Sequence, residues 1–336
     1  MRKMCCIERR RVAAPRRRVS TISIEPRDPV RKILEKSRAA VTIEEPDDQT
    51  RKRKGCVLCI HGAPGSVFDW RYLSPELTLR GYRVVRMDLP GHGLTKRSAL
   101  RDPENGSARS MCSYVRDVMK ELGTEILTEK PVLVGHSMGT ETVVELATQS
   151  LTQKELNVGG IALICPIGRR PHRGLTAGIS TKNMSVFFMP ILKCFGPLKE
   201  KIAKLFSVYA FGFATRTPPE EFYWMFQRAS QVDFKRNASN LDKLASASFP
   251  TLVCHGTSDP LMEPTIHREV LDGWIENSYV STTSAVNTTK AVKDKVRVTS
   301  IQNFRFATFV GENHYVGLKG SVSRVVNYID RILEKD

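Results

Sequence analysis

The first candidate for chemistry is a serine between two glycines, in the sequence G-H-S-M-G at residues 135–139. An apolar run at residues 131–134 predicts a strand before it, and apolar residues at helical spacing predict a helix over residues 138–150. A serine on such a strained strand-to-helix turn has an exposed hydroxyl, and the free N–H groups of the helix N-terminus face the reacting atoms. This context predicts that Ser137 is a nucleophile.

A second loop resembles a motif of the α/β-hydrolase superfamily. H-G-A-P-G-S at residues 61–66 follows an apolar run at residues 56–60, as the H-G motif of that family follows its third strand. The resemblance covers about residues 55–334 and implies the α/β-hydrolase fold. It also implies an oxyanion hole formed by the backbone N–H groups of Ala63 and Met138.

The resemblance also implies the partners of the serine. In that family the nucleophile is followed along the chain by an acid and then by a histidine, each just after a strand. Asp259 and His314 stand at the matching positions, which completes a catalytic triad with Ser137. Glu263 and Glu312 lie close enough in the sequence to remain alternative acids.

A third loop, D-L-P-G-H-G-L-T at residues 88–95, is similar to the family's D-x-x-G-x-G loop. We interpret this loop as structural and His92 within it as a bystander. We likewise expect His61 to fix the loop that follows its strand. The H-G-x-P-G-S pattern is also similar to a group of nematode hydrolase-like proteins.

The elements that position these residues are predicted to form an α/β fold. From residue 55 onward, apolar runs of strand length alternate with helical patterns, which is typical of a mostly parallel sheet covered by helices on both faces. Residues 39–44 are expected to add a short edge strand. The predicted strands are 56–60, 83–87, 131–134, 160–165, 251–255 and 304–310, and the predicted helices are 74–80, 111–122, 138–150, 264–275 and 322–333.

The same pattern predicts three regions. Residues 1–38 are expected to be a basic, flexible extension, residues 39–167 and 249–336 the hydrolase core, and residues 168–248 a helical cap inserted before the acid-bearing strand. Polar residues 277–300 are expected to form a second insertion, which lengthens the spacing between the predicted acid and base.

The positive charge of the chain is concentrated near its start. Of the net charge of +17, residues 1–54 contribute +9, from 17 Lys/Arg and 8 Asp/Glu. A basic tail is most often simply solvated, so we expect no nucleic-acid partner, with contact to an anionic membrane as the alternative. The expected location is cytoplasmic. The alternative is mitochondrial, because residues 1–24 hold seven arginines, one lysine and a single acid.

Cysteine spacing and the motifs give no sign of a cofactor or a metal ion. The eight cysteines lack a regular disulfide or zinc spacing. Cys56 and Cys59 lie three apart on one predicted strand, so they point to opposite faces and cannot form a redox pair.

The predicted cap indicates the kind of substrate. Eight of the 14 phenylalanines lie between residues 187 and 226. If some of these rings line a pocket, the substrate carries an apolar acyl group; otherwise they dock the cap onto the core. Four lysines interleave with apolar residues of the cap and would favour contact with a membrane surface: Lys193, Lys199, Lys201 and Lys204.

These features predict a serine hydrolase, similar to carboxylesterases and lipases, that cleaves an ester, thioester or amide through an acyl-enzyme intermediate. A nucleophilic aspartate, which would indicate epoxide or haloalkane substrates, is replaced here by Ser137. Two alternatives remain open. One is an aminopeptidase similar to proline iminopeptidases, whose H-G-G-P-G loop this chain matches except at Ala63, and the other is a non-catalytic binding protein on the same fold.

Overall fold

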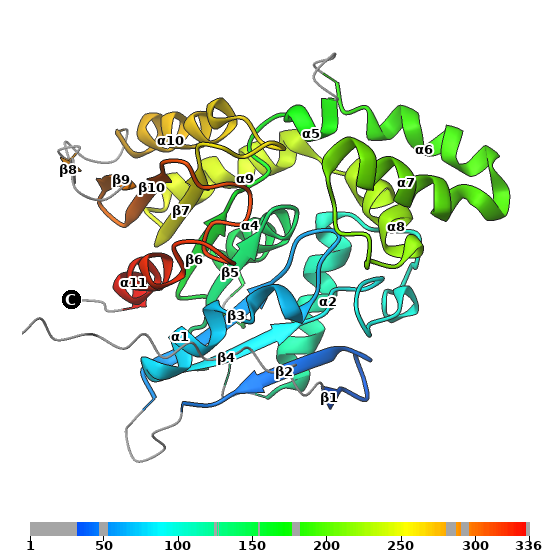
Figure 1. Ribbon diagram of the computed structural model, residues 1–336. Coiled ribbons are helices and arrows are strands. Elements are labelled where there is room, and N and C mark those ends of the chain that lie inside the picture. The colour runs from blue at the N-terminus through cyan, green and yellow to red at the C-terminus, as the bar shows by residue number, and fades with distance from the viewer. Residues whose placement is uncertain are drawn as a thin grey trace, which may run out of the picture.

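A ten-stranded sheet runs through the computed structural model, which describes residues 32–46, 53–123, 126, 128–153, 155–176, 182–279, 287–289 and 296–333 (Figure 1). The strand order is β1-β2-β4-β3-β5-β6-β7-β10-β9-β8. Strands from β4 to β10 in that order are parallel, and antiparallel strands extend both ends. The strands are β1 (Lys32–Ile33), β2 (Ala40–Glu44), β3 (Gly55–Ile60), β4 (Tyr82–Met87), β5 (Val132–His136), β6 (Gly160–Ile164), β7 (Thr251–Gly256), β8 (Asn287–Thr289), β9 (Val296–Ile301) and β10 (Phe304–Phe309).

Helices cover both faces of the sheet because its central strands are apolar on both sides, which confirms the predicted α/β-hydrolase architecture. α1 (Leu73–Leu79) and α11 (Val322–Leu333) cover one face; α2 (Ala108–Glu121), α4 (Gly139–Ser150), α9 (Phe234–Ser246) and α10 (Pro264–Tyr279) cover the other. Cys56 belongs to the core on the α2–α4 side and Cys59 to the core on the α1–α11 side. The two thiols therefore lie on opposite faces, as predicted.

The fold begins earlier than predicted. Residues 32–38 belong to the predicted flexible extension. In the structure, however, β1 pairs with β2, and Leu34 is buried in the core. The Glu121 carboxylate accepts hydrogen bonds from the backbone N–H groups of Lys36 and Ser37, which ties this segment to α2. β2 is therefore not an edge strand. The rest of the predicted extension, residues 1–31, lies outside the described residues.

The predicted second insertion, residues 277–300, partly extends the sheet. α10 continues to Tyr279, and β9 pairs antiparallel with both β10 and β8. Residues 280–286 and 290–295 lie outside the described residues. No helix among the described residues is long and apolar enough to cross a bilayer.

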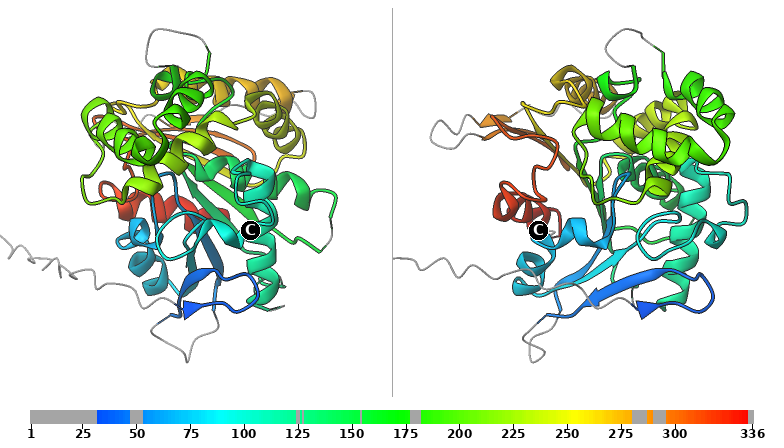
Figure 2. Two further views of the ribbon diagram at one scale, coloured as in Figure 1. Left: turned by 90° about the vertical axis from the view of Figure 1, so that its right-hand side faces the viewer. Right: turned by 45° about the vertical axis from the view of Figure 1, so that its right-hand side comes forward.

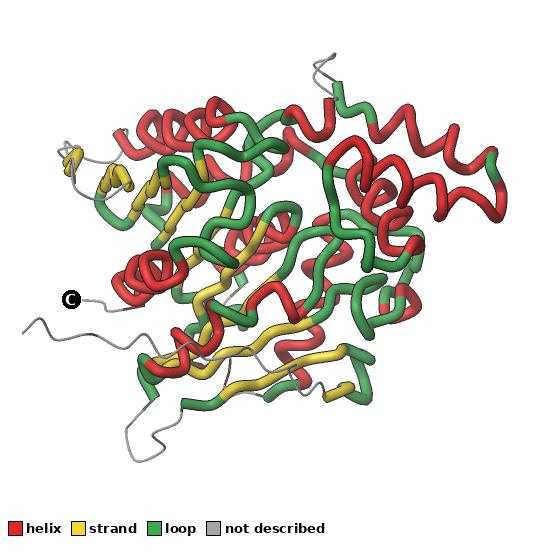
Figure 3. The backbone as a smooth tube through the Cα atoms, viewed as in Figure 1, coloured by secondary structure: helices red, strands yellow, loops and turns green. Residues whose placement is uncertain are grey.

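The helical cap is smaller than residues 168–248, because α9 packs against α4 and α10 in the layer beside the sheet. The cap consists of α5 (Arg173–Thr176), α6 (Ser185–Cys194), α7 (Lys199–Phe211) and α8 (Pro219–Ser230), a block without strands in Figure 3. The helices α6 and α7 form a hairpin that projects from the body (Figures 1 and 2). Short 3-10 helices lie at Val67–Trp70, Arg97–Ala99 and Gly196–Leu198.

Trp224 of α8 anchors the cap to the core. Its indole N–H donates a hydrogen bond of 2.6 Å to the carbonyl oxygen of Pro90. The ring fills the space beside Gly91, where a Cβ atom would lie only 2.4 Å from the indole. The loop at residues 88–95 is therefore a docking point for the cap, in agreement with its predicted structural role.

Candidate active site

Ser137 occupies a sharp turn between β5, which ends at His136, and α4, which begins at Gly139. Its φ angle of 50° lies in the left-handed region, which costs an L-residue about 1–2 kcal/mol. Two hydrogen bonds hold this conformation. The Ser137 N–H donates to the Ile164 carbonyl at 2.9 Å, and the Thr140 hydroxyl donates to the Ser137 carbonyl at 2.6 Å.

The glycines of the motif allow the loop after β3 to pass close to this turn. A Cβ atom at Gly139 would lie 2.4 Å from the carbonyl oxygen of His61, and one at Gly62 would lie 3.0 Å from the Cβ of Ser137. Larger residues at either position would push the loop away from the serine. The two motifs identified separately in the sequence thus fit against each other.

Asp259 and His314 form a buried pair at the ends of β7 and β10, each only 4% exposed. Nδ1 of His314 lies 2.7 Å from Oδ2 of Asp259. The other carboxylate oxygen accepts the N–H groups of Leu261 at 2.8 Å and Met262 at 3.0 Å. Because the carboxylate accepts, Nδ1 carries the proton, and Nε2 of His314 is left as the basic nitrogen.

Asp259 remains ionised in this setting. Burial acts to raise its pKa, but the hydrogen bond and charge of His314 outweigh burial, together with the N–H groups of Met262 and Leu261. The balance lowers the pKa of Asp259 to about 2. A carboxylate with this pKa can hold the imidazole in one tautomer and stabilise an imidazolium.

The two alternative acids are engaged elsewhere. Glu263 accepts the N–H of Arg173 at 2.8 Å and lies 3.5 Å from the guanidinium of Arg170. Glu312 accepts the hydroxyl of Ser321 at 2.9 Å. Of the three candidate acids, only Asp259 contacts His314.

The histidines outside this pair have structural contacts. Nε2 of His61 accepts the N–H of Leu89 at 2.9 Å, so this side chain holds two loops together, as predicted. His92 is buried with its ring 5.2 Å from that of His61.

His136 was not among the predicted site residues. Its Nε2–H donates to the carbonyl oxygen of His314 at 2.8 Å, and burial, with the nearby imidazole of His314, lowers the pKa of His136 to about 3. A neutral His136 therefore fixes the loop that carries His314. Its position directly before Ser137 was the only signal in the sequence.

Ala63 and Met138 are the residues whose backbone N–H groups are predicted to form the oxyanion hole. Both residues line a pocket together with Ser137. Within the described part of the chain, neither backbone N–H donates a hydrogen bond to another group. Two unpaired donors beside a serine hydroxyl suit the binding of a developing negative charge.

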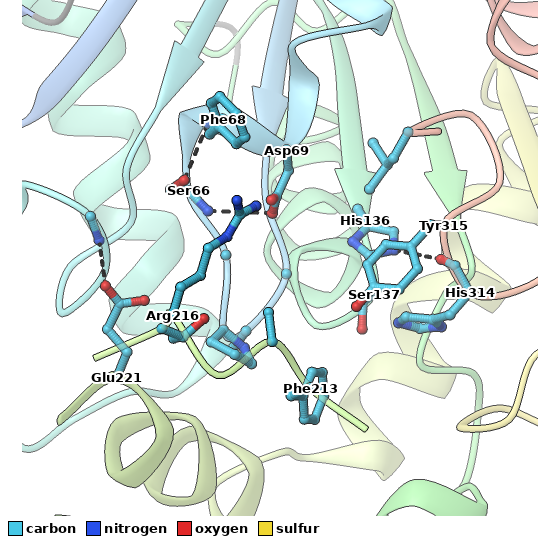
Figure 4. Close-up of a pocket in the computed structure, with 18 of the residues that line it drawn as sticks. Ser66, Phe68, Asp69, His136, Ser137, Phe213, Arg216, Glu221, His314 and Tyr315 are labelled. Atoms are coloured by element: carbon cyan, nitrogen blue, oxygen red, sulfur yellow. Dashed lines mark hydrogen bonds between the residues drawn. The ribbon is translucent and has the colours of Figure 1, made fainter. Parts of the chain in front are cut away.

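Two compartments meet at Ser137. The larger is a polar cavity of about 440 Å³, whose lining includes Ser137, His314, Arg216 and Phe213 (Figure 4). The smaller is an apolar pocket of about 60 Å³ beneath the cap. Its apolar lining comes from both core and cap: Ala63, Met138, Ile167, Leu175, Phe211, Phe213, Met225, Phe226, Ala229, Val232, Leu261 and Met262.

Only some of the aromatic rings of the cap line the apolar pocket. Phe187 is 53% exposed on the outer surface of α6. Phe188 packs against Phe206 and Phe226, and Trp224 anchors the cap to Pro90. The cap residues with large apolar side chains in the pocket are Leu175, Phe211, Phe213, Met225 and Phe226.

Sequence comparison agrees with the α/β-hydrolase fold. The profile of the family described as "Alpha/beta hydrolase of unknown function (DUF1057)" matches residues 35–334. The chain belongs to this family.

Individual relatives of this α/β hydrolase are distant. The Uncharacterized protein F35H12.5 of Caenorhabditis elegans is 22% identical over 296 residues, which cover 84% of this chain and 78% of that protein. Phospholipase YtpA of Bacillus subtilis is 30% identical over 139 residues, covering 41% of this chain and 50% of that protein. A solved esterase from Exiguobacterium antarcticum superposes with a TM-score of 0.56 at 17% identity, over 91% of this chain and 99% of that one, which shows the shared fold.

Cys165 of this α/β hydrolase adds a thiol beside the acid–base pair. Ligand-type atoms of Cys165, Asp259 and His314 lie within 4.8 Å of one another, a spacing that a metal ion would need. However, burial and then the charge of Asp259 raise the pKa of the thiol well above its usual value, so Cys165 is not a thiolate. Nδ1 of His314 is already bound to Asp259. The donor set therefore does not fit a metal ion.

Proposed function

We propose that this protein is a serine hydrolase that cleaves an ester through an acyl-enzyme intermediate on Ser137. The observation that carries the proposal is the combination of a serine at a positive φ angle with a buried Asp259–His314 pair whose histidine lines the same cavity as the serine. Catalysis requires that His314 reach the serine hydroxyl, and both side chains face the cavity in Figure 4. A hydrogen bond between them often forms only when substrate is bound.

In this mechanism each residue has one role. Nε2 of His314 takes the proton of Ser137 as its oxygen attacks the acyl carbon, and Asp259 stabilises the resulting imidazolium. The N–H groups of Ala63 and Met138 hold the tetrahedral oxyanion. His314 then returns the proton to the leaving group, and a water molecule hydrolyses the acyl-enzyme by the same steps in reverse.

The apolar pocket supports a short apolar acyl group. Small-molecule pockets are usually about 300–1,000 Å³, so 60 Å³ accommodates only a few carbons. Similarity to a protein named phospholipase supports an ester as the scissile bond, with thioester and amide as alternatives.

The aminopeptidase alternative receives less support from the cavity. A free amino terminus requires an ionised carboxylate, but the cavity is lined by Arg71, Arg216 and Lys319 as well as by acids. A non-catalytic role would leave the buried Asp259–His314 pair without a purpose, since burying such a pair is costly.

The test is covalent labelling by a fluorophosphonate together with hydrolysis of 4-nitrophenyl butanoate. Wild type should be labelled and active, and Ser137→Ala should lose both properties. The matched control is Ser150→Ala, at the far end of the same helix, which should retain both. Labelling that persists in Ser137→Ala would move the nucleophile elsewhere and overturn the proposal.

A further inference from the structure

The two compartments at Ser137 take different halves of the substrate. In the proposed reaction, His314 protonates the leaving group, so the leaving group lies beside His314. His314 lines the polar cavity but not the apolar pocket, whereas Met138, a predicted oxyanion donor, lines the apolar pocket only. The acyl group therefore occupies the apolar pocket, and the leaving group occupies the polar cavity.

Three cations line the polar cavity, and an aromatic ring lies next to each. The guanidinium of Arg71 lies 4.2 Å from the ring centre of Phe68, and that of Arg216 lies 5.6 Å from the same ring. Nζ of Lys319 lies 5.0 Å from the ring centre of Tyr315. Among the described residues, none of the three cations forms an ion pair with a carboxylate, so their charge is available to a ligand.

The two acids of the cavity do not balance this charge. Burial raises the pKa of Asp69 to about 7, against the opposing effects of the Ser66 N–H and Arg71, so its side chain is only partly ionised near neutral pH. Glu221 accepts the N–H of Gly93 at 3.2 Å and lies 3.5 Å from Nδ1 of His92. The cavity is therefore net positive.

We propose that the leaving group of the substrate is an alcohol or thiol that carries a carboxylate or a phosphate, bound by Arg71 and Arg216. Both guanidiniums lie near the ring of Phe68: Arg71 follows the 3-10 helix of the core, and Arg216 extends from the cap toward that ring (Figure 4). Guanidinium groups bind both anions with paired hydrogen bonds. This proposal rests on the proposed serine hydrolase function.

Two matched substrate pairs test the charge of the leaving group. For a carboxylate, the pair is the butanoyl ester of 3-carboxy-4-nitrophenol and that of 4-nitrophenol. For a phosphate, the pair is the butanoyl thioester of coenzyme A and that of N-acetylcysteamine. We expect kcat/KM to be at least tenfold higher for the anionic member of one or both pairs, and the pair with the larger ratio identifies the anion.

Substitutions test whether Arg71 and Arg216 cause the preference for an anionic leaving group. Arg71→Gln and Arg216→Gln should each reduce the anionic-to-neutral ratio of kcat/KM by about fivefold or more, because each removes a positive charge that only the anionic substrate uses. Arg170→Gln, which removes a surface arginine paired with Glu269, is the control. A wild-type ratio near one, or a high ratio that survives in both variants, overturns this inference. If Ser137-dependent hydrolysis of the neutral ester persists in that case, the proposed function still stands.

A second inference comes from the surface of the cap. Large apolar side chains are exposed along the projecting α6–α7 hairpin, with Tyr209 82% exposed. They lie on α6, on the turn that follows it and on α7, and are called the outer stripe here: Val186, Phe187, Ile191, Phe195, Leu198, Leu205, Phe206 and Tyr209. A concentration of exposed apolar side chains on one projecting hairpin marks an interaction surface.

The charge of the hairpin identifies its partner. Residues 185–211 contain four lysines and one glutamate, so the apolar stripe lies among positive charges. A second copy of this chain would bring like charges together, whereas an anionic lipid surface would attract them. We infer that the hairpin docks on the surface of an anionic membrane, with its aromatic and aliphatic side chains among the lipid headgroups.

Co-sedimentation with lipid vesicles tests this docking. Wild type should bind vesicles of phosphatidylcholine with 30% phosphatidylserine at least tenfold more tightly than pure phosphatidylcholine. The double variant Phe195→Ser, Leu198→Ser should lose this binding, while Leu79→Ser, which changes an exposed leucine of α1, should retain it. Equal melting temperatures would show that the variants are folded. Failure of wild type to sediment with anionic vesicles, or dimers that dissociate in the double variant, would overturn the inference.

Discussion

The two sides of the cavity differ in how firmly the fold holds their side chains. On the core side, Asp259 and His314 follow parallel strands, are almost fully buried and are bound to several neighbours. On the cap side, Phe213 and Arg216 lie on the segment between α7 and α8 and are partly or fully exposed. The comparison indicates that the atoms proposed for the chemistry are preorganised, whereas these two cap residues, which are proposed to contact the substrate, lie on a segment that can vary without disturbing the sheet.

The largest effects should come from the core side. Asp259→Asn and His314→Ala should lower kcat by about three to six orders of magnitude, because the base loses its orientation or is absent. Glu263→Gln and Glu312→Gln are the controls and should retain activity near wild type. Steady-state kinetics on 4-nitrophenyl butanoate would measure this, and an active Asp259→Asn variant would show that the buried pair is not the catalytic one.

Protonation of Asp259 in acid should also lower the free energy of unfolding of the protein. Its pKa is lowered in the folded protein from 3.8 to about 2, so its stabilising contribution is present above about pH 4 and is lost as the pH falls toward 2. The shift corresponds to about 2 kcal/mol. Between about pH 5 and pH 2, the free energy of unfolding of wild type should fall by this much more than that of Asp259→Asn, as measured by urea denaturation. Parallel curves would mean that the carboxylate is not stabilised by its partners.

Changes on the cap side should alter selectivity rather than remove activity. Phe213→Ala and Met225→Ala enlarge the apolar pocket, so each additional substrate methylene should gain up to about 0.8 kcal/mol, or about three- to fourfold in kcat/KM, over one or two more carbons than in wild type. Phe187→Ala is the control, because that ring lies on the outer surface. The measurement is kcat/KM across acetyl to dodecanoyl esters. An unchanged profile in both pocket variants would place the acyl group elsewhere.

The smallest expected effect concerns the strained nucleophile. Ser137→Gly should be more stable than Ser137→Ala by up to about 1 kcal/mol, because glycine adopts a positive φ angle without strain but loses more chain entropy on folding. Thermal or urea denaturation of the two inactive variants provides the comparison. A more stable alanine variant would indicate that the turn is relaxed when the hydroxyl is absent.

The core side was predictable from the sequence because its signals are local. Ser137 follows an apolar run and precedes a helical pattern. Asp259 and His314 each follow a strand, in the order serine, acid and histidine that is typical of α/β hydrolases. Parallel strands bring their carboxyl ends to one edge, so correct strands were enough to place these three residues together.

The cap side was not predictable in the same way. Phe187 and Phe213 look alike in sequence, and only the packing of α6, α7 and α8 determines which ring faces the pocket. Arg216 lies in a segment with no periodic pattern. At the other end of the fold, β1 has only two residues, too few to show an alternation, so its pairing with β2 was missed.

The Trp224 anchor divides the cap into parts of different local stability. Because its indole N–H is bonded to Pro90 and its ring is packed beside Gly91, α8 cannot leave the core without breaking a buried contact. The α6–α7 hairpin has no such connection along its exposed stripe. In native-state hydrogen exchange, the amides of α8 should therefore exchange together with those of the central strands through global unfolding, while those of α7 should exchange earlier through a separate local opening.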